Sequence, residues 1–147
     1  MKIQKIIIAI VVLSAMFCAV SSKTTIAESR RAGSETAKCR IPTFNEAYDY
    51  ADAIFVGKVI GEEKNGDVKT FEFEVEKYWK GAKKTKIKIN VYETARYQAW
   101  FQTGEKYLIY ATADDDGKLK VGRCSRSNEA ENASEDLEKL GAGKNPA

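Results

Sequence analysis

The sequence predicts a mainly β domain of five strands with a short helix at each end. Three observations support this prediction: segments that alternate apolar and charged residues, apolar runs of strand length, and turn residues between them. The predicted strands are residues 54–60, 68–79, 84–92, 106–113 and 118–122. Five strands in about 100 residues favour a small five-stranded OB-fold barrel, and a two-sheet sandwich is the alternative.

The N-terminal helix is predicted from a capping box. Thr43 and Glu46 have the capping-box spacing, and apolar residues then recur at helical period, which predicts a helix over residues 44–52. The first strand, 54–60, is a compact apolar run that contains Gly57. Because glycine inside a strand often marks a bulge, we expect a bulge there.

The second and third strands are predicted to form an antiparallel pair. Asn65-Gly66 precedes the second strand and indicates a tight hairpin turn. The inward residues are Phe71, Phe73 and Val75 on the second strand and Ile87, Ile89 and Val91 on the third; the outward ones are Glu72, Glu74 and Glu76 against Lys86, Lys88 and Asn90. Such a charged ladder sets register and keeps the face solvated. A charged recognition face is the alternative.

The rest of the domain is predicted as a loop, two strands and a helix. The loop, residues 93–103, is rich in aromatic side chains, and an acidic turn at 114–117 joins the last two strands. That turn lacks the spaced later ligands of a calcium loop, so we interpret it as a solvated turn. Asn128 with Glu131 offers a second capping box for a helix that runs to Leu140 and ends at Gly141, before a frayed, disordered tail at 142–147.

The N-terminus has the three-part pattern of a secretory signal. Residues 1–27 contain two early lysines, an apolar run too short for a comfortable membrane span, and a small polar stretch. We therefore predict a secreted or cell-envelope protein with no stable membrane span after signal removal. Residues 28–38 are polar and are expected to be a flexible leader. Lipidation at Cys18 is the alternative, although Phe17 is not the small residue that such a site prefers.

Charge and composition exclude several function classes. The signal carries three of the 24 basic residues and none of the 21 acidic ones, so the mature chain is neutral and nucleic acid is not an expected partner. The chain has no histidine, no glycine-rich phosphate loop and no nucleophile elbow. We therefore expect no catalytic residues, no metal site and no cofactor.

Two cysteines remain once the signal is removed. An exported chain meets an oxidising compartment, where two thiols usually pair, so Cys39 and Cys124 are predicted to form a disulfide around the domain. Two buried free thiols are the alternative.

Several motifs resemble a known family. They are "EAYDYADAIFVGKV" from Glu46, "FEFEVEKYWKG" from Phe71, "FQTGEKYLIYA" from Phe101, "CSRS" from Cys124 and "EDLEKLG" from Glu135. In this order they resemble the netrin-like domains, and among them the bacterial branch of the tissue inhibitor of metalloproteinases (TIMP) family. The resemblance covers about residues 39–141. It implies an OB barrel with flanking helices and a protein partner, with a zinc metalloprotease as the candidate.

The chain departs from the family at its inhibitory tip. In the family a Cys-x-Cys supplies an N-terminal amine and carbonyl that chelate the protease zinc. Here the first of these positions is Ala37, and the loop at 97–99 lacks the cysteine that would pair with it. Both members of one bridge are therefore absent together, which supports pairing of Cys39 with Cys124.

These observations lead to one hypothesis and two alternatives. The hypothesis is a secreted, non-catalytic protein-binding module. Its candidate contact surface comprises Arg40, Ile41, Pro42, Tyr97, Trp100 and Phe101. For Trp100 and Phe101 the competing interpretation is that they plug the end of the barrel. The functional alternatives are direct metalloprotease inhibition by the family mechanism and an envelope or adhesion-related structural module.

Overall fold

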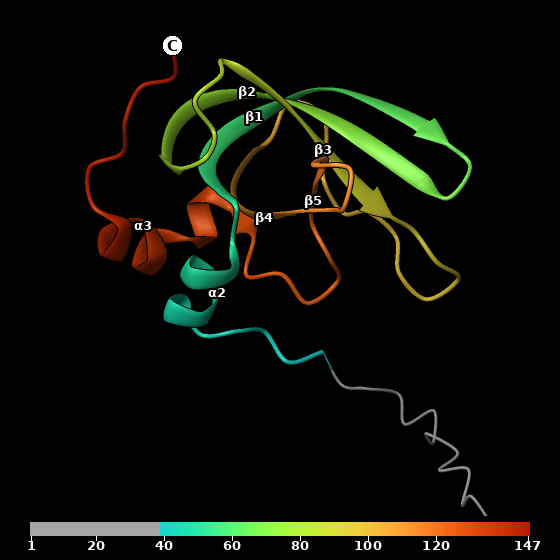
Figure 1. Ribbon diagram of the computed structural model, residues 1–147, viewed down its shortest axis with the longest axis horizontal. Helices are drawn as coiled ribbons and strands as arrows, with labels where there is room; N and C mark the ends of the chain where they lie inside the picture. The colour runs from blue at the N-terminus through green and yellow to red at the C-terminus, as the bar shows by residue number, and fades with distance from the viewer. Residues whose placement is uncertain (1–38) are drawn as a thin grey trace, which may run out of the picture. The chain divides into compact units, whose positions relative to one another are not determined.

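The computed structural model describes residues 39–147, which form a mainly β structure (Figure 1). The signal, the leader, Cys18 and Ala37 lie outside these residues. The strands are β1 (Ala53–Asn65), β2 (Val68–Lys80), β3 (Lys86–Tyr92), β4 (Lys106–Ala113), β5 (Leu119–Lys120) and β6 (Asn128–Glu129). The helices are α2 (Phe44–Tyr50), the 3₁₀ turn η1 (Ala130–Asn132) and α3 (Ser134–Leu140).

Five of the six strands form a closed ring. The sheet order is β1-β2-β3-β5-β4-β6, and β1 also pairs with β4, which closes the ring through β1, β2, β3, β5 and β4. All six strands belong to one continuous sheet. All pairings are antiparallel except that of β3 with β5, which is parallel and consists of Asn90 opposite Lys120 alone.

The long strand β1 pairs with β2 along its whole length and with β4 over residues 53–58. Its pairing with β2 shifts register at three places, one of them between Val56 and Gly57, which confirms the predicted bulge. A Cβ atom at Gly57 would lie 2.8 Å from the carbonyl oxygen of Glu74, so the close strand approach requires glycine. The predicted hairpin turn is also confirmed: Gly66, with φ 60°, follows Asn65 directly.

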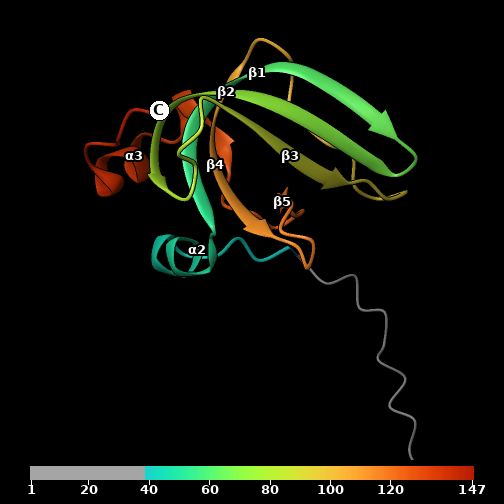
Figure 2. The same cartoon turned by 45° about the horizontal axis from the view of Figure 1, so that its top comes forward.

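The core has two layers, which explains the apolar runs in β1 and β4. The larger cluster lies within the ring and includes Phe55, Phe71, Phe73, Ile89 and Ile109. The smaller cluster joins Ile54, Leu108 and Tyr110, on the opposite face of β1 and β4, to Ala47, Ala51 and Ala133 from the helical segments. Figures 1 and 2 both show α2 and α3 at one end of the sheet, away from the tip of the β1–β2 hairpin. Strands β1 and β4 are therefore buried on both faces.

The predicted ladder of glutamates against lysines is present, but it forms no ion pairs of its own. Glu72 lies opposite Lys88, and Glu74 opposite Lys86. Within residues 39–147 neither pair makes a salt bridge, and Glu76 instead pairs with Lys106 of β4 at 2.7 Å. The ladder lysines therefore keep their charge free on the surface.

The C-terminal part of the chain differs most from the prediction. The proposed cap at Asn128 is wrong: this residue is in β6, opposite Leu108, and α3 begins later, after Ala133, without a side-chain cap. Pairing with β4 satisfies backbone N–H and C=O groups that helical hydrogen bonds would otherwise have satisfied. The end of α3 before Gly141 is as predicted.

The last residues are held against β2 rather than frayed. The backbone of Lys144 exchanges two hydrogen bonds with Tyr78, and the N–H of Ala147 donates to the carbonyl of Lys83 at 2.9 Å. The structure thus differs from the disordered tail expected at 142–147. No helix in the described part of the chain has the length and apolar character needed to cross a membrane.

Candidate functional site

A disulfide fixes the segment that leads into α2. Cys39 is bonded to Cys124, 85 residues later, with their Cα atoms 5.3 Å apart. The pairing expected from the sequence is therefore present, and the alternative of two free buried thiols is not. Cys124 is exposed and Cys39 is half-buried, so solvent reaches the bridge.

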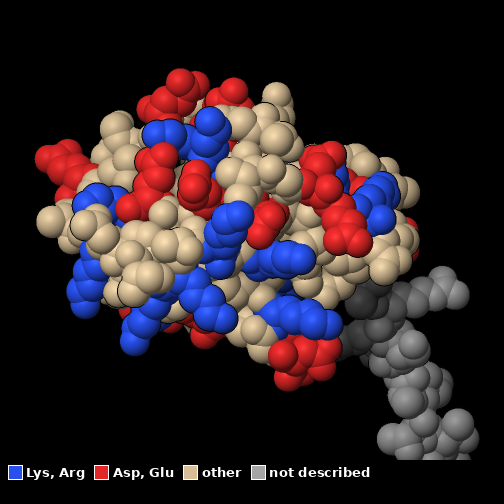
Figure 3. Space-filling model, turned by 90° about the horizontal axis from the view of Figure 1, so that it is seen from above, with Lys and Arg blue, Asp and Glu red and all other residues tan. Residues whose placement is uncertain are grey.

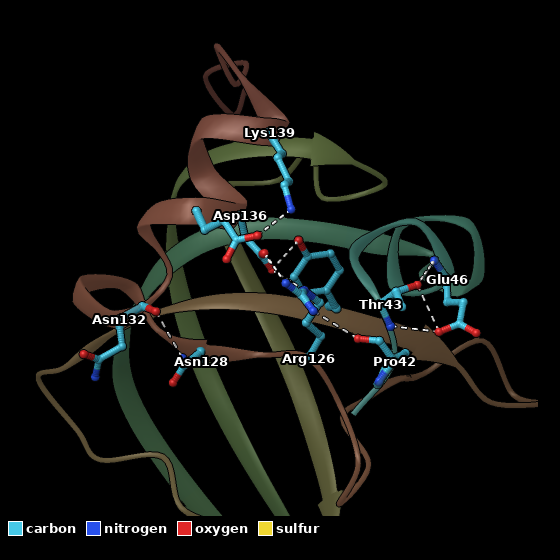
Figure 4. Close-up of polar contacts among 10 residues, drawn as sticks. Pro42, Thr43, Glu46, Arg126, Asn128, Asn132, Asp136 and Lys139 are labelled. Carbon is cyan, nitrogen blue, oxygen red and sulfur yellow. Dashed lines mark hydrogen bonds and ion pairs between the residues drawn. The ribbon is translucent and has the colours of Figure 1, made fainter. Parts of the chain in front are cut away.

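A polar network beneath this segment holds it to the core (Figure 4). The guanidinium of Arg126 donates two hydrogen bonds to the carboxylate of Asp136, Nε to Oδ2 at 2.7 Å and Nη2 to Oδ1 at 2.6 Å. The Tyr110 hydroxyl donates to the same Oδ2 at 3.0 Å, and Arg126 Nη1 donates to the carbonyl of Pro42 at 3.1 Å. The network therefore links α3 and β4 to the backbone next to the disulfide.

The two donor groups of the network, the Tyr110 hydroxyl and the Arg126 guanidinium, stay protonated. Removal from water raises the pKa of the Tyr110 hydroxyl well above its usual range, and the nearby carboxylate of Asp136 adds to the effect. The hydrogen bonds that Arg126 donates to Asp136 also raise the pKa of Arg126. Both groups therefore remain protonated and able to donate at any physiological pH.

The capping box of α2 supplies the third anchor. The Glu46 carboxylate accepts from the Thr43 N–H at 2.8 Å, while Thr43 Oγ1 accepts from the Glu46 N–H at 3.4 Å, as predicted. Arg40 also forms an exposed ion pair with Glu46 at 2.8 Å. The hydrogen bond from Thr43 N–H, followed by that from Arg40, lowers the pKa of Glu46 to about 2, so the cap stays ionised down to strongly acidic pH.

Two large apolar side chains project from this anchored region. Ile41 is 62% exposed, and Tyr50 at the end of α2 is 77% exposed. Pro42 and Tyr50 line one shallow cavity of about 130 Å³, and Ile41 borders another of about 300 Å³ against Arg126 and Asp136. We call Cys39–Pro42 together with Tyr50 the disulfide rim.

The aromatic loop does not join this rim. Phe101 is 3% exposed inside the ring, so the expectation that it is exposed for a partner is wrong. Tyr97 and Trp100 are half-buried and pack against the same cluster. Trp100 and Phe101 thus take the alternative role of filling the ring, and no cavity or hydrogen bond within the described chain connects this loop to the disulfide rim.

Three important residues were not singled out from the sequence. Tyr50 falls at a helix end, where exposure depends on the path of the next strand. Arg126 carried one available signal, because it lies within the "CSRS" motif two residues after Cys124. Asp136 sits in the acidic first turn of α3, where a carboxylate usually has a simple helix-dipole role.

Known proteins do not resolve the function. Comparison of the sequence with models of protein families and with characterised proteins found no match. Residues 39–147 contain no cluster of three or more His, Cys, Asp or Glu side chains able to hold a metal ion. The disulfide rim is therefore the arrangement from which a function can be argued.

Replacing Asp136 should show how much the polar network contributes to the stability of the fold. We expect Asp136→Ala to lower the free energy of unfolding by about 3 kcal/mol, because Arg126 and Tyr110 lose their acceptor in a part of the molecule that water reaches poorly. The measurement is urea denaturation. The matched control is Glu135→Ala, which removes a neighbouring exposed carboxylate and should change stability by less than about 0.5 kcal/mol. Equal effects for both variants would contradict the role given to Asp136.

Proposed function

We propose that residues 39–147 are a secreted or envelope-associated, non-catalytic protein-binding module with an OB fold, similar to the netrin-like and TIMP-like class. We further propose that its partner is a zinc metalloendopeptidase, bound through the disulfide rim. The observation that carries this proposal is the exposure of Ile41 and Tyr50 on firmly anchored backbone. Rigid apolar side chains make effective contact anchors because little conformational freedom is lost on binding.

The fold supports the assignment to this class. The ring order β1-β2-β3-β5-β4, with β3 parallel to β5 and the remaining neighbours antiparallel, is the arrangement expected of a five-stranded OB barrel. One helix precedes the ring and another follows it, in agreement with the flanking helices that the resemblance implies. Fold alone does not specify a partner, so the partner class rests on the motif resemblance together with the rim.

The proposed mode of action is steric contact rather than zinc chelation. The family's chelating position corresponds to Ala37, and Cys39 is joined to Cys124 within a continuing chain. A peptide nitrogen within a chain has no free amine to offer a metal. The rim would instead cover the substrate cleft of the protease, with Ile41 as its central anchor.

Inhibition assays on a panel of purified zinc metalloendopeptidases test this proposal. We expect the mature protein to inhibit at least one, and Ile41→Asp to raise the inhibition constant about 30-fold, the loss typical of an interface anchor. Tyr92→Asp is the matched control, because it adds the same charge at another exposed apolar residue, 46% accessible, and should leave inhibition unchanged.

An N-terminal extension separates the two mechanisms. Inhibition by steric contact should survive one added residue, whereas chelation by a free N-terminus should be lost. Failure to inhibit any panel member would overturn the protease assignment and favour the alternative, an envelope or adhesion-related structural module.

A further inference from the structure

Strand β3 has one edge that is largely unpaired. It pairs with β2 from Lys86 to Tyr92, but on its other side it meets β5 at Asn90 alone. The Asn90 carbonyl accepts from the N–H of Val121 at 3.1 Å, so the backbone of Asn90 faces away from β2. Successive residues of a strand direct their backbone groups to opposite edges, so every second residue faces the same edge. The N–H and C=O groups of Lys86 and Lys88 therefore also face away from β2.

Nothing in the described chain pairs with these groups. The short strand β5 reaches only Asn90, and no backbone hydrogen bond from the turns on either side extends to Lys86 or Lys88. Both residues are exposed. The ring therefore leaves two donors and two acceptors of β3 available, at the two-residue spacing of a β-ladder.

A basic groove of about 960 Å³ runs along this edge. It is bordered by β3, by the β1–β2 hairpin and by the turns before β3 and β5. Its charged lining consists of five lysines, Lys83, Lys84, Lys86, Lys88 and Lys118, and one acid, Glu63. Within residues 39–147 only Lys118 of these lysines has a salt-bridge partner, Asp116 at 3.5 Å. Figure 3 shows basic side chains across the middle of the face seen from above, with acidic ones between them.

We propose that this groove binds an extended acidic peptide segment, which adds to the free edge of β3 as a further strand. Lys84, Lys86 and Lys88 recur at every second position, the same period at which side chains of a strand share one face. Acidic residues at alternate positions of the guest would therefore meet one lysine each. The backbone of Lys86 and Lys88 would supply the ladder hydrogen bonds, as in other cases of strand addition.

The backbone argument favours a peptide over other polyanions. A polyphosphate or an acidic polysaccharide can match the lysine charges but cannot satisfy alternating N–H and C=O groups along a strand edge. The partly buried side chains of Ile87 and Leu119 in the groove also suit apolar residues of a peptide. Lysines on a strand edge can equally serve to repel other strands, and under that role no peptide would bind. The groove is separate from the disulfide rim, so this inference stands or falls independently of the proposed function.

The test uses an eight-residue peptide of alternating glutamate and valine and the purified mature protein. Binding is followed by titration calorimetry, and the probed site by amide hydrogen exchange. We expect the amides of Lys86 and Lys88, free in the unliganded protein, to exchange at least 10-fold more slowly at saturating peptide. Two further peptides carry N-methyl groups on every second backbone nitrogen, one on the glutamates and the other on the valines. The peptide whose methyl groups block the nitrogens that face β3 should bind at least 10-fold more weakly.

Variants and a charge control complete the test. Lys86→Glu/Lys88→Glu should weaken peptide binding at least 10-fold, while Lys58→Glu/Lys139→Glu, with the same charge change outside the groove lining, should not. Short-chain inorganic polyphosphate should leave the exchange of the Lys86 and Lys88 amides unchanged. No peptide binding, binding without protection of these amides, or equal protection by polyphosphate would each overturn the proposal.

Discussion

Cys124→Ser should lower the free energy of unfolding by about 4.5 kcal/mol, the largest single effect that we expect. The bridge closes a loop of 85 residues, and the chain-entropy model gives this value for a loop of that length. In a domain of about 100 residues such a loss lowers the melting temperature by about 20 °C. Thermal unfolding followed by circular dichroism measures it directly.

Two controls assign the effect to the bridge. The double variant Cys39→Ser/Cys124→Ser has no leftover thiol and should melt at the same temperature as the single variant. Because solvent reaches the bridge, dithiothreitol should bring the unmutated protein to that temperature as well. A melting temperature unchanged by both mutation and reduction would mean that the two cysteines are not joined in solution.

Phe101→Ala should lower the free energy of unfolding by about 4 kcal/mol. The ring of Phe101 lies edge-on to Phe71, Phe73 and Tyr107 at centroid distances of 5.0–5.4 Å, and its removal leaves a cavity in the centre of the core. Urea denaturation gives the value.

The matched comparison is Ile41→Ala, which also shortens an apolar residue of the surface proposed from the sequence. Ile41 is 62% exposed, so its truncation should change stability by less than about 0.5 kcal/mol. The pair therefore separates a packing residue from a contact residue. A small loss for Phe101→Ala would restore its loop to the list of contact surfaces.

Local patterns predicted the β-rich part of this chain well. Alternation of apolar and charged residues assigned the side chains of β2 and β3 to the correct faces of the sheet. The strand predicted at 106–113 has the same first and last residues as β4. The capping box at Thr43 and the bulge at Gly57 were equally visible, because each depends on residues close in sequence. The helix α2 ends at Tyr50, two residues earlier than predicted, where the chain turns extended to enter β1.

Features that depend on distant contacts were not predictable in this way. Asn128 has a capping-box spacing to Glu131, but β4 offers its backbone a strand partner instead. Residues 142–147 carry no strand pattern, yet the edge of β2 is open to them. The burial of Phe101 follows from ring closure, and an aromatic loop in a sequence has the same composition whether it fills a core or meets a partner.

The docking of the chain end has a practical consequence for fusion proteins. Ala147 bonds to Lys83, which lines the basic groove, so a segment attached after Ala147 starts beside that groove. A short flexible linker would hold an attached acidic sequence there at millimolar effective concentration. A C-terminal tag of acidic composition would therefore compete with added ligands as a tethered occupant, whereas a neutral tag would leave the groove accessible.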